Sequence, residues 1–256
     1  MLKHFIQKAT GLYVYRKPPR GADIFADIAN DLPKLKITTV FDVGANLGQS
    51  AAEYLRFFPD AEIHCFEPVM ATAAKLEERL GTRIQVHRIA LSSSDGEGRM
   101  SLEGSPDTFR LVGATAAPDN GKMENVVVQT LDSFCSARRV DHISYLKIDT
   151  EGADLEVLRG SSKMLSENRI DLIQLEAGMS PLHDWHVPFE TLKASLEDFN
   201  YHLFSVFEQT RNWYPGGPYL QWANPVFVSN KVVDAHREKS FTSASEQPVE
   251  KSGVVE

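Results

Sequence analysis

Cysteine is scarce in this sequence of 256 residues. Cys65 and Cys135 are the only two, and neither belongs to a CxxC or CxxH spacing. Two such residues cannot form the disulfide framework of a small secreted protein, so a reducing compartment is expected. The sequence therefore favours a cytoplasmic protein in which both cysteines are buried apolar residues.

Long apolar runs are absent as well. No window approaches the roughly 18 consecutive apolar residues that a membrane-spanning helix needs, and residues 1–20 lack the uninterrupted apolar core of a secretory signal. Neither membrane spanning nor export is expected. With 42% hydrophobic and 24% charged residues, the chain has the composition of a soluble globular protein with one large domain or two small ones.

The first 20 residues contain no acidic side chain. They carry five lysines and arginines, which leaves a formal charge of −13 on the rest because the whole chain carries −8. A body of that charge repels phosphate backbones, so a nucleic-acid substrate is not expected. The basic segment predicts a short amphipathic helix that either caps the domain, the favoured alternative, or lies on a membrane surface or a partner enzyme. Its apolar positions are Leu2, Phe5, Ile6, Ala9 and Leu12.

Short apolar runs alternate with helical patterns from residue 37 onward. This alternation is typical of βαβ units and of a mostly parallel sheet with helices on both faces, so an α/β fold is expected. We assign residues 1–36 to a basic segment with capping helices, 37–230 to one domain, and 235–256 to a disordered tail. Residues 98–124 are polar and rich in glycine and proline, which predicts a long loop with one edge strand at 99–102. Strands are predicted at 39–43, 63–66, 84–91, 126–128, 143–148, 170–175, 201–207 and 225–229, and helices at 49–58, 70–80, 154–165 and 189–199.

Residues that follow strands form the candidate site, because ligands of an open parallel sheet bind outside the carboxyl ends of its strands. The first strand is followed by Gly44-Ala45-Asn46-Leu47-Gly48, a turn in which glycine lets the backbone approach a ligand where a helix begins. The second strand ends at Glu67, 25 residues after Asp42, where an acid can accept both hydroxyls of a ribose. Together the two features predict a nucleoside-containing cofactor.

One missing glycine and one acid decide which cofactor is expected. A dinucleotide fingerprint has a third glycine, but Ala51 and Ala52 follow Gln49-Ser50 here, which disfavours NAD and FAD. Asp42 would favour a sulfonium or an ammonium group and would repel a pyrophosphate. S-adenosylmethionine is therefore the expected cofactor.

Lys147 is unusual in a strand that should be covered on both faces, because a buried lysine needs an anionic partner. Asp149 lies two residues further along and points to the same face of the strand. The two residues predict either a plain structural ion pair or a site in which Asp149 faces the ligand. We favour a functional role for Asp149 because it comes at the end of its strand.

Five motifs in a fixed order resemble the FkbM-type methyltransferases. They are FDVGANLGQS at 41–50, CFEP at 65–68, TLDSF at 130–134, LKIDTEGADLEVLRG at 146–160 and IQLEAG at 173–178. The resemblance spans about residues 40–228 and implies a class I, Rossmann-like, S-adenosylmethionine-dependent O-methyltransferase. It implies a seven-stranded sheet with its last strand antiparallel, and acceptor hydroxyls on sugars or polyketide products, often in glycan biosynthesis. It further implies that Asp42, Gly44, Asn46 and Gly48 line the methionine part of the cofactor, Glu67 the ribose, and Ala90 and Leu91 the adenine.

The last informative strand ends at Glu176 and leads into a loop that contains His183, Trp185 and His186. Tryptophan can stack on a sugar face and histidine can accept a hydroxyl proton, which suits a carbohydrate acceptor. An exposed loop whose tryptophan caps the edge of the sheet explains the same residues equally well. The candidate general bases are Asp149, His183 and His186. Asp149 and Glu176 could also hold Mg²⁺, a less favoured alternative.

The predicted reaction is a displacement in which an acceptor hydroxyl attacks the methyl group of the sulfonium, with positioning as the main source of rate. Two other functions fit parts of the pattern. A nicotinamide-dependent oxidoreductase also places an acid after its second strand, and a non-catalytic cofactor-binding scaffold could join a biosynthetic complex through residues 1–20. The acceptor is not identified, because the loops at 98–124 and 179–188 that would select it carry no transferable code.

Overall fold

The structure, a computed structural model, describes residues 17–112, 122–211 and 218–237, together with residues 7, 8, 10, 11 and 15. Most of the predicted basic helix lies outside the described residues. The tail predicted at 235–256 begins too early, because α9 (Asn230–His236) continues to His236, and its residues from 238 onward lie outside the described part. Within the described part of the chain, no helix is long and apolar enough to cross a membrane.

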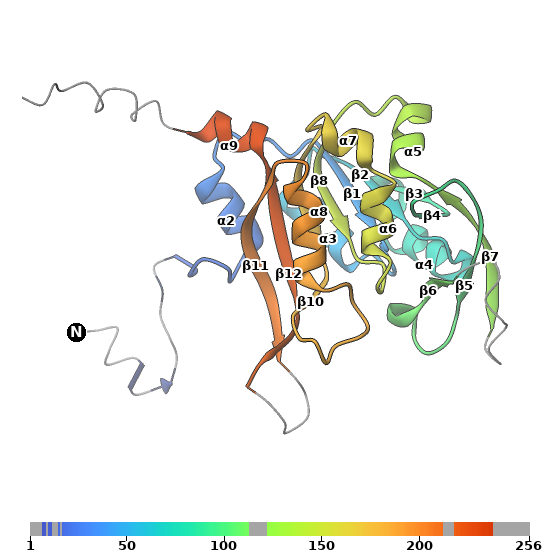
Figure 1. Ribbon diagram of the computed structural model, residues 1–256, viewed down its shortest axis with the longest axis horizontal. Coiled ribbons are helices and arrows are strands. Elements are labelled where there is room, and N and C mark those ends of the chain that lie inside the picture. Colours follow the sequence, from blue (N-terminus) through green and yellow to red (C-terminus); the bar gives the residue numbers. More distant parts are fainter. Residues whose placement is uncertain are drawn as a thin grey trace, which may run out of the picture.

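The main sheet consists of β1 (Thr39–Val43), β2 (Glu62–Phe66), β3 (Gln85–His87), β8 (Ile143–Ile148), β9 (Ile170–Leu175), β10 (Ala177–Gly178), β11 (Tyr201–Arg211) and β12 (Leu220–Ser229). Its order is β10-β12-β9-β8-β1-β2-β3, with β11 also paired to β12 (Figure 1). The pairs among β1, β2, β3, β8 and β9 are parallel, whereas β12 runs antiparallel to β9 and β11. The carboxyl ends of the parallel strands therefore meet at one edge of the sheet.

The predicted α/β class is confirmed, and β12, which is last in the chain, is antiparallel as expected. The described sheet has eight strands and not seven, because the two-residue β10 pairs with β12. Every residue of β8 and β9 is buried. These strands are therefore mostly apolar on both faces, as expected of strands covered on both sides, with Lys147, Asp171 and Gln174 as buried exceptions.

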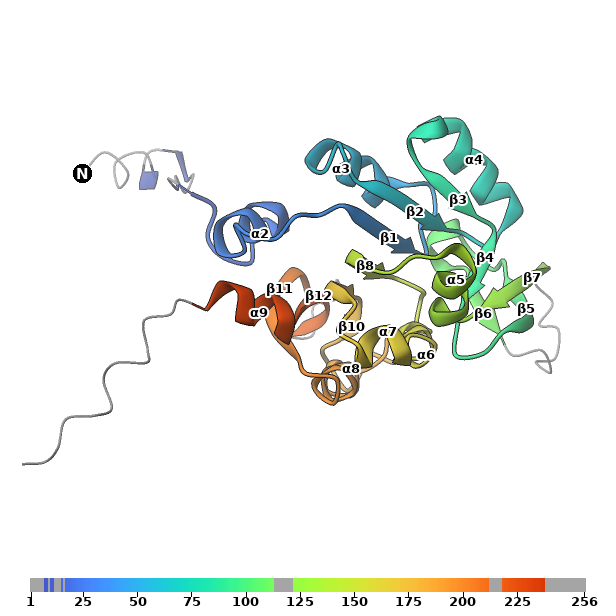
Figure 2. The same cartoon turned by 90° about the horizontal axis from the view of Figure 1, so that it is seen from above.

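Helices cover both faces of the main sheet (Figure 2). On one face, α5 (Leu131–Arg138), α6 (Asp154–Arg159), α7 (Ser162–Ser166) and α8 (Phe189–Glu197) share a core with the sheet, and on the other face α2 (Ile24–Asp31), α3 (Gln49–Phe57), α4 (Met70–Leu80) and α9 (Asn230–His236) do so. Neighbouring residues of one strand serve the two cores: Leu146 points into the first and Tyr145 into the second. Helices α2 and α9 contribute Ile28 and Val232 to the second core. The folded domain therefore begins before residue 37 and ends after residue 230, the bounds predicted from the sequence.

A second, four-stranded sheet is built from β4 (Ile89–Leu91), β5 (Gly96–Ser101), β6 (Arg110–Val112) and β7 (Met123–Gln129). Its order is β4-β7-β5-β6, in which β4 and β7 are parallel and β5 runs antiparallel to both of its neighbours. Two short 3-10 helices, η1 (Gly81–Arg83) and η2 (Pro106–Thr108), precede β3 and β6. Ala90, Met100, Val126 and Val128 form the apolar interior of this sheet, together with Val69.

Three predictions about elements are wrong. The strand expected at 84–91 divides at Arg88 into β3 and β4, which belong to different sheets. The stretch 98–124 was expected to be mostly loop, but it contains β6 and most of β5, and the strand at 126–128 belongs to the second sheet. The helix expected at 154–165 is interrupted at Gly160, between α6 and α7.

Candidate active site

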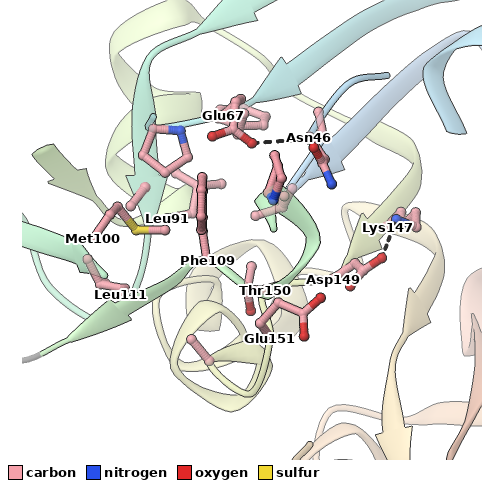
Figure 3. A pocket seen from close by; sticks show the side chains of 18 of the residues that line it. Asn46, Glu67, Leu91, Met100, Phe109, Leu111, Lys147, Asp149, Thr150 and Glu151 are labelled. Carbon is pink, nitrogen blue, oxygen red and sulfur yellow. Dashed lines mark hydrogen bonds and ion pairs between the residues drawn. The ribbon is translucent and has the colours of Figure 1, made fainter. Parts of the chain in front are cut away.

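A cavity of about 280 Å³ lies between the carboxyl ends of β1, β2 and β8 and the second sheet (Figure 3). Its polar wall comes from the segments that follow these strands, and its apolar wall comes from β4 to β6. The side chains labelled in Figure 3 divide accordingly, with Met100 and Leu111 at one end and Lys147 and Asp149 at the other. Six of the residues predicted from strand ends line it: Gly44, Asn46, Glu67, Ala90, Leu91 and Asp149.

Gly44 allows the turn after β1 to touch the end of β8. Its φ is +82°, and a Cβ placed on it would lie 1.8 Å from the backbone oxygen of Asp149. No side chain fits there, so the cavity floor is bare backbone. Gly48 does not line the cavity. It precedes α3 as the N-cap residue, with a φ of +79°. A Cβ at this position would lie 2.4 Å from the Leu76 side chain, so the lack of a side chain on Gly48 lets α3 and α4 pack closely.

Glu67 fixes the polar corner of the cavity. Its carboxylate accepts hydrogen bonds from the backbone N–H groups of Asn46 at 3.1 Å and Val69 at 2.9 Å. Burial raises the pKa of Glu67 to about 7, although these two hydrogen bonds act in the opposite direction. Beside it, the Asn46 side-chain oxygen is buried and has no hydrogen-bond partner among the described residues. This corner therefore offers acceptors to a ligand that brings hydroxyl or amine donors.

The opposite end of the cavity is apolar. Ala90 and Leu91 form one side of it, and three side chains of the second sheet and its η2 turn form the other: Met100, Phe109 and Leu111. Sequence reasoning missed these last three. The available signal was the long polar stretch at 98–124, whose few apolar residues alternate in β5 and β6 and so mark one face of a strand pair.

Lys147 and two acids form a buried ion cluster at the centre of the sheet edge. The Lys147 ammonium lies 2.8 Å from Asp149 Oδ2 and 3.7 Å from Asp42 Oδ1, since β1 and β8 place Asp42 opposite Lys147. Burial alone would lower the pKa of Lys147, but the charges of Asp149 and Asp42 outweigh it and raise that pKa. Burial raises the pKa of Asp42, whose side chain is 0% exposed and lies behind the cavity wall. The structure thus places Asp42 next to Lys147 and not in the wall itself.

Asp149 keeps its charge at the cavity surface. Burial acts to raise its pKa, but Lys147 outweighs burial, so the pKa of Asp149 is lowered. Burial raises the pKa of Glu176, which follows the adjacent strand β9, to about 6. Asp154, which the sequence analysis did not select, is buried and accepts the hydroxyl hydrogen bond of Thr150 at 2.8 Å, which holds the loop after β8 in place.

The two predicted histidines lie beside the cavity and do not line it. His186 is buried, and its Nε2 lies 3.2 Å from Glu176 Oε2 and 3.7 Å from Glu151 Oε2. Its Nδ1 lies 2.9 Å from Nε2 of His183. The Trp185 indole N–H donates to Glu151, and Glu151 itself lines the cavity. The loop after β10 is therefore tied to the loop after β8 through side chains that sequence reasoning only partly selected.

The comparison with known proteins decides the family. The sequence profile of the Methyltransferase FkbM domain matches residues 42–203, which is more than half of the chain. The chain belongs to the FkbM methyltransferase family. The profile begins at Asp42 and includes the loops after β1, β2 and β8 that form the polar wall of the cavity.

Curated relatives of this FkbM methyltransferase are themselves named as methyltransferases. The chain is 26% identical over 199 residues to the 2-O-methyltransferase NoeI of Sinorhizobium fredii, covering 72% of this chain and 81% of the relative. It is 29% identical over 148 residues to the hexuronic acid methyltransferase AglP of Haloferax volcanii, covering 56% of this chain and 57% of the relative. A solved structure of M. capricolum TrmK with S-adenosyl-homocysteine aligns with a TM-score of 0.41 and 10% identity, over 79% of this chain and 67% of that one. That TM-score is too low to support an inference.

As an FkbM methyltransferase, the protein is an enzyme with a class I fold that uses S-adenosylmethionine. The cavity fits that cofactor, because it combines a bare glycine turn, an orphaned amide oxygen on Asn46 and an acid on Glu67 with an apolar end. Both other functions considered for the sequence, the nicotinamide-dependent oxidoreductase and the non-catalytic scaffold, are set aside by the family assignment.

Proposed function

We propose that this protein transfers a methyl group from S-adenosylmethionine to a hydroxyl oxygen of a sugar or glycan. The observation that carries the proposal is Asp149 at the cavity surface, paired with Lys147 at 2.8 Å, in the loop to which Trp185 is hydrogen-bonded through Glu151. The names of two relatives agree with it, since one is a 2-O-methyltransferase and the other a hexuronic acid methyltransferase. When bound, S-adenosylmethionine supplies a methyl group on a positively charged sulfur, which needs no further activation.

Binding of the cofactor is assigned to the residues in the cavity wall. Glu67 would accept hydrogen bonds from the ribose hydroxyls, and Asn46 would offer its free oxygen to a donor on the methionine part. Ala90 and Leu91 would hold the adenine against the apolar side chains of the second sheet. Asp42 would act indirectly, by fixing the Lys147 ammonium from behind.

Asp149 is the proposed proton acceptor. Lys147 fixes its Oδ2 at 2.8 Å, so the group is oriented and ionised before an acceptor arrives. As the acceptor oxygen forms its bond to the methyl carbon and the carbon–sulfur bond breaks, the hydroxyl proton would pass to this carboxylate. A base in this position typically contributes about 10² to 10⁴ in rate.

His183 and His186, the other candidate bases, are proposed to position the site. His183 Nε2 accepts the backbone N–H of His186 at 3.3 Å and faces His186 Nδ1, so its lone pair is already in use. His186 Nε2 faces two carboxylates. A Mg²⁺ ion at Asp149 and Glu176, the alternative predicted from the sequence, would compete with the Lys147 ammonium, which already lies 2.8 Å from the Asp149 carboxylate.

The test is Asp149→Asn with Asp184→Asn as its matched control, since Asp184 is an exposed acid on the nearby loop. Calorimetry measures S-adenosylmethionine binding, and formation of S-adenosylhomocysteine is followed with a panel of free sugars, glycosides and non-sugar alcohols. We expect turnover of Asp149→Asn to fall about 10² to 10⁴-fold while the cofactor still binds, and Asp184→Asn to match the wild type. Near wild-type turnover of Asp149→Asn would remove the assignment of the base, and turnover only with non-sugar alcohols would remove the sugar acceptor.

A further inference from the structure

Three side chains from separate loops point at one spot beside the cavity. Glu151 follows β8, Glu176 follows β9, and His186 lies in the loop after β10. Each brings one ligand atom to within 4.8 Å of the other two. The two glutamates are partly buried and His186 is buried, so the group is not a cluster of acids on an open surface.

The hydrogen bonds of the two histidines define which nitrogen of His186 is available. The backbone N–H of His186 donates to Nε2 of His183, so this nitrogen carries a lone pair. Nδ1 of His186 lies 2.9 Å from the same nitrogen and must therefore carry a hydrogen. His186 Nε2 is then left facing Glu176 and Glu151. A neutral ring would present its lone pair to two anions, so the arrangement requires a positive charge between them.

Either a proton or a metal ion could supply that charge, and the spacing suits a metal. Two ligand atoms that each lie about 2.1 Å from a tetrahedral ion are about 3.4 Å apart. The observed separations from His186 Nε2 are 3.2 Å to Glu176 and 3.7 Å to Glu151. Both separations from His186 Nε2 are therefore compatible with a shared ion, and the two glutamate oxygens lie within 4.8 Å of each other.

Hydrogen bonds from neighbouring groups orient the three side chains, as they orient the ligands of metal ions in proteins. A metal-binding histidine usually donates its second ring N–H to a fixed acceptor, which is the relation of His186 to His183. The Trp185 indole N–H orients the Glu151 carboxylate. The backbone N–H of Glu176 donates to Asp154 at 3.3 Å, which fixes the end of β9.

We propose that Glu151, Glu176 and His186 bind a divalent transition-metal cation such as Mn²⁺ or Zn²⁺. The imidazole ligand selects this class over Mg²⁺ and Ca²⁺, which prefer oxygen ligands alone. The site shares Glu176 with the pair that the sequence suggested for Mg²⁺, but Glu151 and His186 replace Asp149. Because Glu151 also lines the cavity, a bound cation would lie where it can bind an oxygen of the acceptor, a role that rests on the proposed function.

The experiment titrates chelator-treated, dialysed protein with Mn²⁺ alone, following heat by calorimetry and free Mn²⁺ by electron paramagnetic resonance. We expect one Mn²⁺ per chain with a Kd below about 100 μM. Loss of a residue that only supports a metal ligand typically lowers the affinity for the metal about 10 to 100-fold. Glu151 and His186 are proposed as direct ligands, so Glu151→Gln and His186→Gln should each weaken Mn²⁺ binding by at least about tenfold. Asp184→Asn, which removes an equal charge from the same loop region, should bind as the wild type does.

Two results would overturn the proposal: no saturable Mn²⁺ binding by the wild type below about 1 mM, or unchanged affinity in Glu151→Gln. If His186→Gln does not fold, as circular dichroism would reveal, the Glu151→Gln comparison decides alone, because Glu151 is only partly buried. The titration contains neither cofactor nor acceptor. A negative result therefore removes the metal site and leaves the proposed methyl transfer to be judged by its own assay.

Discussion

Glu67 should make cofactor binding depend on pH in the neutral range. Burial raises its pKa to about 7, so the carboxyl group is mostly ionised at pH 8 and mostly protonated at pH 6. Only the ionised form can accept two ribose hydroxyls while it also accepts the N–H groups of Asn46 and Val69. We expect the Kd for S-adenosylmethionine to rise about tenfold as the pH falls from 8 to 6, as measured by calorimetry.

Glu67→Gln should abolish this dependence of the Kd on pH. At pH 8 it should also weaken binding by about 10 to 100-fold, the effect of a lost hydrogen bond to a charged group. Glu77→Gln is the control, because Glu77 is an exposed acid that pairs with Arg88 outside the cavity. An equal pH dependence in wild type and Glu67→Gln would assign the titration to another group.

Single residues at strand ends were predictable, because a strand end in a parallel sheet has a known place in space. Gly44, Asn46, Glu67 and Asp149 all lie in the cavity wall for this reason. Asp42 belongs to the same motif but lies behind the wall, since it is inside β1 and its neighbour across the sheet is Lys147. Which side of the wall a residue occupies depends on strand register, which no local pattern encodes.

At the scale of elements, sequence patterns predicted most strands of the main sheet and several of its helices, but missed two interruptions and the strands within 98–124. The sequence at 84–91 has no turn residue to divide it, but its halves pair with different partners, β3 with β2 and β4 with β7. Such a change of sheet depends on where β7 lies, and β7 is more than 30 residues away in the chain. The second sheet as a whole could not be predicted for the same reason, because β4 and β7 are far apart in the chain, although the apolar residues of β5 and β6 offered a local signal.

The break between α6 and α7 has a local steric cause that can be tested. A Cβ at Gly160 would lie 2.0 Å from the backbone oxygen of Ser92, so the helix cannot carry a side chain where it touches the end of β4. Helix propensity alone predicts that Gly160→Ala stabilises the protein by up to about 1 kcal/mol. Overpacking against backbone costs about 1 to 3 kcal/mol or more, so we expect net destabilisation.

Urea unfolding followed by circular dichroism measures this difference. Gly81→Ala is the matched control, because Gly81 ends α4 and a Cβ there would meet nothing within 4 Å. Its cost should be about 1 to 3 kcal/mol, which reflects its positive φ alone and no contact with other atoms. A stabilised Gly160→Ala variant would show that the contact with Ser92 does not interrupt the helix.

At the scale of the whole molecule, the cavity lies between the two sheets, which also meet where Ile89 and Leu91 of β4 pack into the main core. Its polar wall belongs to the main sheet, and its apolar wall comes from Met100, Phe109 and Leu111 of the second sheet region. A cofactor bound to both walls stabilises them together. At about 100 times its Kd, S-adenosylmethionine should add about 2.7 kcal/mol to the free energy of unfolding. For a chain of this size that corresponds to a rise in Tm of about 5 to 10 °C.

Differential scanning calorimetry should therefore record one transition that moves upward as a whole when the cofactor is added. Glu67→Gln at the same cofactor concentration should move less, because its affinity is lower while the apolar wall is intact. Two transitions, of which only one responds to the cofactor, would mean that the second sheet unfolds on its own. In that case the apolar wall would contribute little to binding, and the long segment between β4 and β7 would be an independent unit and not part of the cofactor site.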